Sequence, residues 1–323
     1  MPLSNDKNSI AEDYDGSLLR GFAQQKTLKE SVSCQGIGLH TGNQVKMTLH
    51  PAAANTGIVF VRSDIGEDGY VDASWRNVTE TKLATTISNE AGHHVSTIEH
   101  LMAGLAGCGI DNILVEINAP EVPVMDGSAE PFVSMIESAG VILQSVRRKA
   151  IMINKPIKVG NKDSSISLNP ASTFGVSFEI EFCNSTLASQ ALDMKLVNGT
   201  FKDEIASART FGFACQVDAL KKAGLALGGS LDNAIVIEDD NVLNQDGLRY
   251  HNEFVRHKIL DCVGDLYLAG APIIGQVDAV RSGHALNHEL LCALFSNTDT
   301  WSISELSAAV VPGTGNLFAE ITH

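Results

Sequence analysis

The sequence contains no apolar run that is long enough to cross a membrane. Its most apolar stretch, residues 101–110, is ten residues long and is broken by glycine, whereas a membrane-spanning helix needs about 20 apolar residues. The first sixteen residues also lack the apolar segment that a secretory signal requires. These absences predict a cytoplasmic protein without stable membrane insertion.

Basic charge and paired cysteines are also scarce. Lys and Arg total 23 against 38 Asp and Glu, which gives a net charge of −15. Proteins that bind nucleic acid without sequence preference need a basic surface to neutralise phosphates, so we expect no nucleic-acid partner. The six cysteines lie far apart and form no CxxC pair, which argues against a disulfide framework and against a structural zinc knuckle.

Length and composition predict a globular protein of about two domains. The chain has 323 residues, of which 44% are hydrophobic, and a domain takes roughly 150 residues. Residues 1–20 are polar and aperiodic, and we expect them to be a disordered leader. A basic run before a new strand separates an N-terminal domain over 21–148 from a C-terminal domain over 149–300, with 301–323 as a C-terminal extension. Strands and helices are segregated in both halves, which is typical of the α+β class.

Strands are expected where β-rich runs lie between Gly and Pro signals, and helices where apolar residues recur at helical spacing. The predicted strands cover residues 45–49, 58–61, 113–117, 151–154, 166–168, 176–182 and 273–280. One predicted helix runs from Ser96 to about Gly107, and a short one ends near Gly140. Three more are predicted over 214–223, 252–268 and 285–295.

His257 and Asp261 are spaced i and i+4 inside the helix that is predicted over 252–268. On a helix they share one face, so an imidazole nitrogen and a carboxylate oxygen can converge on one metal ion. Asp265, one turn further on, lies close to the same stripe. The same spacing is common in surface pairs, so the pattern leaves both interpretations open.

A second polar group opens the helix that is predicted from Ser96. Glu99 stands three residues after Ser96, which is the spacing of a capping box, in which Glu99 would bond back to the first backbone amide. If Ile98 and Leu101 face the core, the adjacent His100 points away from it. His100 is then either an ordinary exposed residue or a metal ligand, and Glu99 is either a cap or a general base.

Two histidines and one aspartate would leave the fourth position of a zinc ion open for water, as in catalytic zinc sites. His284 lies between a predicted strand and a predicted helix, where it is either a helix cap or a second proton-transfer group with a pKa near neutrality. Arg256, Lys258 and Arg281 add positive charge to an otherwise acidic chain. These residues together make an anionic substrate plausible.

Seven motifs in register carry a resemblance to a known family. They are GIGLHTG, VSTIEHLMAGLAGCGIDN, PVMDGSAEPF, SARTFGF, GLALGGSLDNAIV, FVRHKILDCVGDL and SGHALNHELL, and the match covers residues 27–295. In this order they resemble the UDP-3-O-acyl-N-acetylglucosamine deacetylases, the zinc enzymes of the committed step of lipid A synthesis in Gram-negative bacteria. The polar leader and the residues after 297 fall outside the resemblance.

The resemblance implies a fold and a role for each site residue. The fold has two domains of similar α+β topology with helices packed on β-sheets, a small insert in each domain, and the active site at the domain interface. The zinc ligands of the family correspond to His100, His257 and Asp261. The catalytic residues correspond to Glu99 as general base, His284 held by Asp265, Thr210 as donor to the oxyanion, and Lys258 near the reacting centre.

Residues 211–227 match the insert that forms the acyl-chain passage of the family. The candidate substrate-binding residues in it are Phe211, Phe213, Val217 and Leu220. Plain core packing would produce the same apolar face. Arg281 joins this group because of its positive charge. Some members have cysteines where this chain has Ala84 and Ala226, so its acyl preference can differ from theirs.

The resulting hypothesis is a zinc-dependent hydrolase. As a cytoplasmic monomer, it would remove the N-acetyl group of UDP-3-O-acyl-N-acetylglucosamine and release acetate and UDP-3-O-acyl-glucosamine. Two alternatives stay open. One is a zinc amidase that acts on another amide or amino sugar. The other is a non-catalytic protein in which Glu99 caps a helix and the histidines are surface groups.

Overall fold

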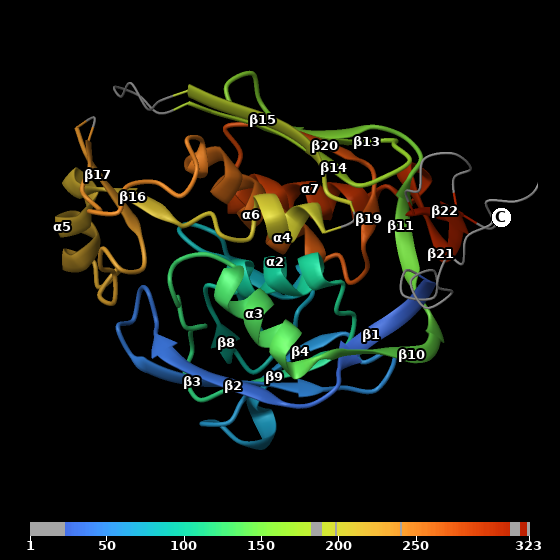
Figure 1. Ribbon diagram of the computed structural model, residues 1–323, viewed down its shortest axis with the longest axis horizontal. Coiled ribbons are helices and arrows are strands. Elements are labelled where there is room, and N and C mark those ends of the chain that lie inside the picture. The colour runs from blue at the N-terminus through green and yellow to red at the C-terminus, as the bar shows by residue number, and fades with distance from the viewer. Residues whose placement is uncertain (1–22, 182–188, 198, 240, 311–316, 322–323) are drawn as a thin grey trace, which may run out of the picture.

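The computed structural model describes residues 23–181, 189–197, 199–239, 241–310 and 317–321. It is a mixed α+β structure with several sheets and helices (Figure 1), and at that level the predicted fold class is confirmed. The leader that is predicted over residues 1–20 lies outside the described residues.

Two five-stranded sheets form the framework. The first consists, in spatial order, of β2 (Val32–Ile37), β3 (Gln44–Pro51), β9 (Ile113–Ile117), β4 (Ile58–Arg62) and β5 (Tyr70–Asp72). The second consists of β12 (Ile157–Gly160), β13 (Ser165–Asn169), β20 (Gln276–Val280), β14 (Gly175–Glu181) and β15 (Ser189–Lys195). In each sheet the middle strand is antiparallel to its neighbour on one side and parallel to its neighbour on the other. The two halves of the chain therefore share one sheet topology, as the resemblance implies.

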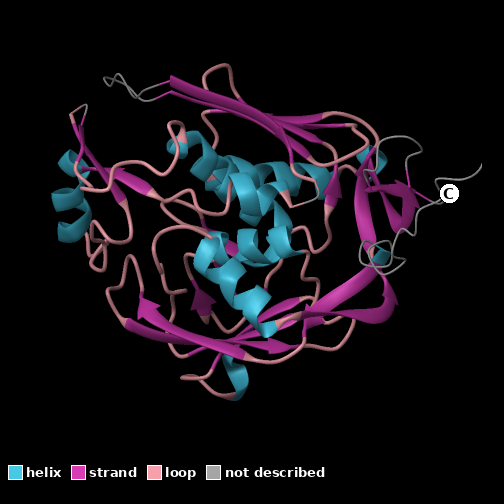
Figure 2. Ribbon diagram, in the orientation of Figure 1, coloured by secondary structure: helices cyan, strands magenta, loops and turns pink. Residues whose placement is uncertain are grey.

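The longer helices of the core lie between the two sheets (Figure 2). They are α2 (Glu99–Cys108), α3 (Glu130–Ala139), α6 (Glu253–Tyr267) and α7 (His284–Ser296). Along the chain α2 precedes and α3 follows the middle strand β9, just as α6 precedes and α7 follows β20. No helix in the described part of the chain is long and apolar enough to span a membrane.

The core lies between the sheets and this helical layer. In β3, Val45, Met47 and Leu49 are buried while Gln44 and Lys46 are exposed, because successive side chains of a strand point to opposite faces. Helix α6 is buried along nearly its whole length, since it lies between α2 on one side and β14 and β15 on the other. Side chains of α6 are therefore shielded from water even where they are charged.

Helices α2 and α6 approach each other closely at Gly264. A Cβ at this position would collide with the carbonyl oxygen of Glu99, so glycine permits a separation that a larger residue would prevent. The contact joins the two halves of the chain and sets the first turn of α2 beside the middle of α6.

Smaller elements complete the structure. β1 (Gln24–Leu28) pairs with β10 (Val141–Arg147), and a three-stranded sheet contains β6 (Val78–Glu80), β7 (Thr86–Ser88) and β8 (His94–Val95). A second three-stranded sheet contains β16 (Phe211–Phe213), β17 (Ile235–Glu238) and β18 (Asn241–Val242), with α5 (Ala214–Lys222) beside it and α4 (Thr200–Glu204) before it in the chain. The last sheet contains β19 (Ile273–Ile274), β11 (Lys149–Ile153), β21 (Trp301–Val310) and β22 (Leu317–Ile321).

All the predicted strands and helices are present, but two of them were wrong in extent. The strand over 273–280 is interrupted and divides into β19 and β20, which belong to different sheets, and the helix expected from Ser96 begins at Glu99. The sequence patterns do not reveal β10, β12 and β15, which lie at sheet edges and bury few side chains completely. Residues 301–310, expected in a C-terminal extension, form β21, which pairs with β11 through residues 301–305 and with β22 through residues 306–310.

Candidate active site

The close contact between α2 and α6 brings together the three predicted metal ligands. His100 lies in the first turn of α2, and His257 and Asp261 lie one turn apart on α6. The Oδ1 atom of Asp261 is 3.6 Å from Nε2 of His100 and 3.3 Å from Nε2 of His257. All three side chains are buried, and their ligand atoms lie within 4.8 Å of one another, so the group can hold a metal ion.

The hydrogen bonds around this group leave its inner atoms free for a cation. Oδ2 of Asp261 accepts a hydrogen bond of 2.6 Å from Nζ of Lys258, while the buried Oδ1 has no hydrogen-bond partner among the described residues. Nδ1 of His257 lies 3.1 Å from the carbonyl oxygen of Ala208, so it carries the proton and Nε2 keeps its lone pair. A buried carboxylate oxygen without a donor is costly, and a metal ion between these atoms would satisfy it.

The charge states of the ligands suit the same purpose. Burial lowers the pKa of His257 to about 4, which keeps its imidazole neutral near pH 7. Burial alone would raise the pKa of Asp261, but the charges of His257 and Lys258 hold it well below the usual range. A neutral imidazole and an ionised carboxylate are the forms that bind a metal.

A second polar cluster lies beside the ligands and joins three helices. Glu99 comes from α2, Asp265 from α6 and His284 from the start of α7. Nδ1 of His284 lies 2.8 Å from Oδ2 of Asp265, and its Nε2 lies 3.9 Å from Oε1 of Glu99. The structure thus brings together, in one buried region, six of the residues that sequence analysis placed in the site.

The two proton-transfer candidates have pKa values shifted toward their proposed work. Burial raises the pKa of Glu99 above that of an ordinary glutamate. Burial would lower the pKa of His284, but the carboxylate of Asp265 outweighs this effect and raises it to about 9. A carboxylate that binds a proton more readily and an imidazole that stays protonated are a base and an acid next to one metal site.

Comparison with known proteins identifies the family of the chain. Residues 25–296 match the family described as UDP-3-O-acyl N-acetylglycosamine deacetylase. The chain belongs to this deacetylase family. Membership makes it a deacetylase of lipid A biosynthesis.

Curated relatives with the name UDP-3-O-acyl-N-acetylglucosamine deacetylase are similar over most of the chain. The protein of Vibrio parahaemolyticus is 45% identical over 92% of this chain and 97% of its own length. That of Acidithiobacillus ferrooxidans is 47% identical over 90% of this chain and 95% of its own length. That of Syntrophus aciditrophicus is 44% identical over 86% of this chain and 88% of its own length.

The capping-box interpretation of Glu99 is wrong for this deacetylase. The residue before α2 is Ile98, which makes no side-chain cap, and the Glu99 carboxylate instead accepts a 3.0 Å hydrogen bond from the backbone N–H of Thr85. Ser96 lies in an isolated bridge with Glu121, and its hydroxyl accepts a hydrogen bond from Thr86. Thr97, which would be the first helical residue after a cap at Ser96, has a φ of 56° in the left-handed region, so the helix cannot begin there.

The exposed position considered for His100 is also wrong, since only 4% of the residue is accessible. Ile98 and Leu101 do face the core, as expected. The opposite side of α2, however, is covered by α6 from the second half of the chain. Helical periodicity could not reveal this second buried face.

Sequence analysis missed the residues that surround the Asp265 carboxylate. Oδ1 accepts a 2.5 Å hydrogen bond from the hydroxyl of Thr85, and Oδ2 accepts a 2.8 Å hydrogen bond from the amide of Asn287. The side-chain oxygen Oδ1 of Asn287 in turn accepts a hydrogen bond from the hydroxyl of Ser282. Asn287 stands one turn after His284 on α7, and that spacing was a usable signal; Thr85 offered none.

The segment that carries Thr210 is held beside the metal ligands. The backbone N–H of Thr210 donates to the carbonyl oxygen of Gly127, and the preceding Arg209 forms a buried ion pair with Glu253 of α6, with Nε 2.9 Å from Oε1. The ring of Phe211 packs edge-on against the ring of His257, with 6.1 Å between ring centroids. Phe211 therefore contacts one of the candidate metal ligands, and its role in substrate binding stays a prediction.

The predicted acyl insert, residues 211–227, contains β16 and α5, and together with β17 and β18 it forms a small unit. Phe213, Val217 and Leu220 are half-buried within it. Leu227 and Leu231 are 51% and 47% exposed. The apolar face of the insert is thus only partly used in packing, and apolar side chains remain accessible.

Arg281 makes its contacts with residues outside the metal-ligand and proton-transfer clusters. Its guanidinium is 2.8 Å from a carboxylate oxygen of Glu181 and donates to the carbonyl oxygen of Asp163. Its φ of 48° is in the left-handed region, which is uncommon for a residue with a side chain. A role for Arg281 in substrate binding stays a prediction.

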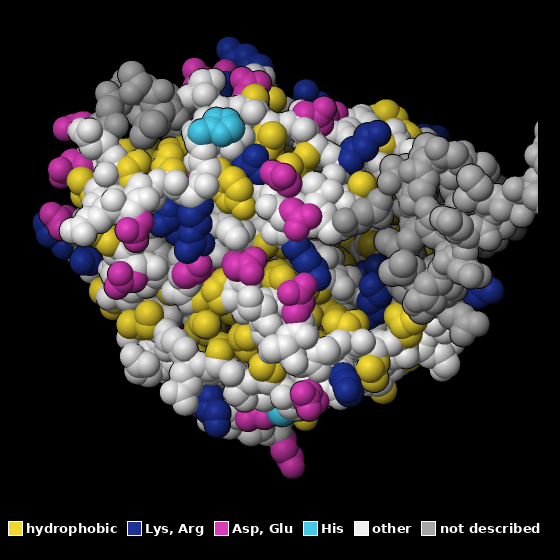
Figure 3. Space-filling view, in the orientation of Figure 1, with side chains coloured by type: hydrophobic (Ala, Val, Ile, Leu, Met, Phe, Trp, Pro, Cys, Tyr) yellow, Lys and Arg dark blue, Asp and Glu magenta, His cyan; other side chains and the backbone are white. Residues whose placement is uncertain are grey.

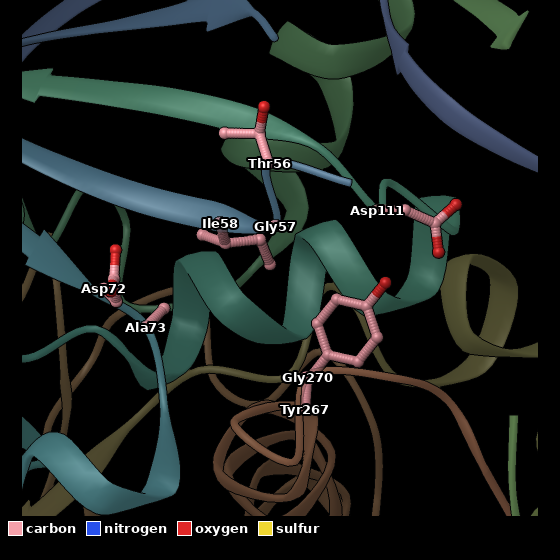
Figure 4. Close-up of a pocket in the computed structure, with 8 residues that line it drawn as sticks. All are labelled: Thr56, Gly57, Ile58, Asp72, Ala73, Asp111, Tyr267 and Gly270. Atoms are coloured by element: carbon pink, nitrogen blue, oxygen red, sulfur yellow. The ribbon is translucent and has the colours of Figure 1, made fainter. Parts of the chain in front are cut away.

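A separate hollow of about 250 Å³ lies at the end of α6 (Figure 4). Its walls come from the start of β4, the end of β5 and the end of α6, and they include Asp72, Asp111 and Tyr267. Asp111 is already engaged by Arg148 at 2.6 Å, and Tyr267 donates to the carbonyl oxygen of Ile110. None of the predicted site residues lines this hollow.

Proposed function

We propose that this deacetylase removes the N-acetyl group of UDP-3-O-acyl-N-acetylglucosamine with a zinc ion held by His100, His257 and Asp261. The observation that carries the proposal is the buried Oδ1 atom of Asp261, which lacks a donor and lies between two imidazole nitrogens. A set of two histidines and one carboxylate suits zinc and leaves a position open for chemistry. The Glu99–His284 cluster next to it supplies the proton transfers.

Zinc bound by these ligands would supply a Lewis acid that polarises the acetamide carbonyl and makes water more acidic. Glu99 takes the proton of the attacking water, since its carboxylate is buried and its pKa is raised. Lys258 keeps Oδ2 of Asp261 engaged, so that Oδ1 faces the metal position. In each of these roles, the atom that acts has no stronger interaction with another described residue.

His284 and Thr210 act on the charge that develops during the reaction. His284 stays protonated because of Asp265, so it stabilises the oxyanion together with the hydroxyl of Thr210 and then donates a proton to the leaving amine. Glu99 could return its own proton to the same amine. Comparing the rates of Glu99→Gln and His284→Ala separates these two routes.

The substrate would be held by residues on both sides of the metal site. Phe211 packs on His257, and Phe213, Val217 and Leu220 offer an apolar face for the acyl chain. Arg281 is the candidate for the anionic nucleotide. Basic side chains are interspersed among acidic ones on the face that Figure 3 shows, which favours a small anionic substrate over nucleic acid.

We extend the proposal to the organisation of the molecule. The shared sheet topology supports two domains, over 21–148 and 149–300, with residues 301–323 as an extension and the active site at the domain interface, where α2 meets α6. A monomeric state and a cytoplasmic location remain predictions of the sequence.

Acetate release from UDP-3-O-acyl-N-acetylglucosamine, with and without a chelator, tests the function. We expect release that stops with the chelator and returns on addition of zinc. A matched substrate without the acyl chain should react more slowly, because the apolar insert would have nothing to bind. Equal turnover of unrelated N-acetyl amides would favour the alternative, a zinc amidase of other specificity.

A further inference from the structure

Thr85 contacts both carboxylates of the proton-transfer cluster. Its backbone N–H donates to Oε2 of Glu99 at 3.0 Å, and its hydroxyl donates to Oδ1 of Asp265 at 2.5 Å. Its carbonyl oxygen accepts a hydrogen bond from the N–H of Ile98, directly before α2. The residue is only 2% exposed, so water does not compete for these bonds.

The geometry points to Thr85 as a positioning residue that holds Glu99 in register with the Asp265–His284 pair. This inference deepens the proposed function and rests on the roles given there to Glu99 and His284. Thr85 itself is not a proton donor or acceptor in the reaction. It acts through the two carboxylates that it bonds.

Glu99, Asp265 and His284 need such a link because they come from three different helices. Glu99 and His284 are 3.9 Å apart, which is too far for a hydrogen bond between them. Their spacing therefore depends on what holds each one. Thr85 bonds Glu99 directly, and it reaches His284 through the carboxylate of Asp265.

The hydroxyl of Thr85 also completes the hydrogen bonding of Asp265. Oδ2 of Asp265 interacts with His284 and accepts from Asn287, both of which belong to α7. The Thr85 hydroxyl bonds the opposite oxygen, Oδ1, from the first half of the chain. With one oxygen held from each side, the carboxylate cannot rotate away from the imidazole. A misplacement of about 1 Å can cost an enzyme roughly 100-fold in rate.

Removal of the hydroxyl also changes the electrostatics of His284 in a defined direction. The charged groups that face His284 are Asp265 and Asp261 from α6 and Glu99 from α2, and none of them is altered by a change at Thr85. Without the Thr85 hydroxyl, the anion of Asp265 depends more on the imidazolium for stabilisation. The pKa of His284 should therefore rise.

Thr85→Val tests the inference, because valine has nearly the same shape and lacks only the hydroxyl. We expect kcat to fall about tenfold or more, which corresponds to a loss of at least one hydrogen bond in the transition state, while KM changes less than twofold. Zinc content should stay at the wild-type level, and the alkaline limb of the pH–rate profile should move to higher pH. Thr85→Ser, which keeps the hydroxyl, should restore both kcat and the profile.

A purely structural role would give a different pattern. It would lower Tm and zinc content in Thr85→Val and would not be restored by serine. If Thr85→Val folds poorly, Thr85→Ala tests the same hydroxyl in a smaller side chain. Wild-type kcat and an unchanged profile in a folded, zinc-loaded hydroxyl-free variant would overturn the inference.

Parallel variants separate this inference from the proposed function. If Glu99→Gln and His284→Ala are nearly inactive while Thr85→Val behaves as wild type, only the role of Thr85 is wrong. If Glu99→Gln and His284→Ala retain full activity, the proposed roles of those residues fail first.

Discussion

At the scale of single residues, the carboxylate of Glu99 lies between the candidate metal ligands and the Asp265–His284 pair. Glu99 directly precedes His100 in the chain, and its Oε1 atom lies 3.9 Å from Nε2 of His284. Its pKa is raised by burial. These properties lead to two predictions about proton transfer.

We predict that Glu99→Gln loses catalysis without losing the fold. The amide oxygen of glutamine can still accept the hydrogen bond from Thr85, but it cannot take a proton near pH 7. General-base catalysis contributes about 10²–10⁴-fold, so acetate release should slow by that factor with Tm and zinc content unchanged. His284→Ala, assayed beside it, shows which residue protonates the amine. Turnover of Glu99→Gln close to the wild-type rate would require another base.

Ser96→Ala is the matched control for Glu99→Gln. A Ser-to-Ala change at a true N-cap costs about 1 kcal/mol, but the Ser96 hydroxyl caps no helix and bonds only to Thr86. We therefore expect a smaller loss of stability and a nearly normal rate. A loss of the full capping free energy would revive the capping-box interpretation.

The second residue-scale prediction concerns pH. His284 has a pKa raised to about 9 by Asp265, so it is protonated below that pH, and the rate should fall as the pH rises through it. Asp265→Asn removes the negative charge that stabilises the imidazolium, which lowers the pKa of His284. The alkaline limb of the pH–rate profile should move to lower pH while zinc stays bound. An unmoved limb would mean that Asp265 does not control His284.

At the scale of secondary-structure elements, the pair of helices α2 and α6 builds the site. The three proposed ligands, the carboxylate of Glu99 and the carboxylate of Asp265 all project from these two helices. Their separation is set at Gly264, where a Cβ would meet the carbonyl oxygen of Glu99. The position of each ligand therefore depends on a residue that carries no side chain.

We predict that Gly264→Ala lowers stability and zinc content together. The added methyl forces α2 away from α6, and such overpacking typically costs about 1–3 kcal/mol. His100 would then move away from His257 and Asp261, which share a helix and would stay together. Thermal unfolding and metal analysis of the purified variant check both effects. Full zinc content at wild-type Tm would show that the helices do not need this close contact.

At the scale of the whole molecule, the proposed zinc ligands join distant parts of the chain. His100 belongs to the first half, and His257 and Asp261 belong to the second. A metal that binds only the folded protein stabilises it by mass action, by about 2.7 kcal/mol when free metal is about 100 times Kd. Metal binding should therefore stabilise the contact between the two halves.

We predict that chelation lowers Tm by several degrees as well as abolishing activity, and that added zinc restores both. His100→Ala, His257→Ala and Asp261→Ala should each lose zinc, because two remaining ligands hold it poorly. Calorimetry and metal analysis of the purified variants test this. Full metal content in all three variants would mean that the ligand set is wrong.

The sequence by itself determined the family, the candidate site residues, the inner strands of the two five-stranded sheets and the helices of the layer between them. The i and i+4 spacing of His257 and Asp261 placed two ligands on one helical face, and the order of the motifs identified the family that the profile match confirms. Strands such as β9 were predicted to the residue, since a continuous apolar run between turns leaves little choice. These signals are local, so a single segment contains all that is needed to interpret them.

Contacts between two distant segments of the chain were decided only by the tertiary structure. It showed that Glu99 bonds to Thr85 and not to the start of its own helix, and that His100 is covered by α6. It also revealed Thr85, whose hydroxyl bonds Asp265 across the two halves of the chain. A spacing pattern reports on neighbours within one helix or strand. Contacts between α2, α6 and α7 depend on how separate elements pack, and no local pattern encodes that.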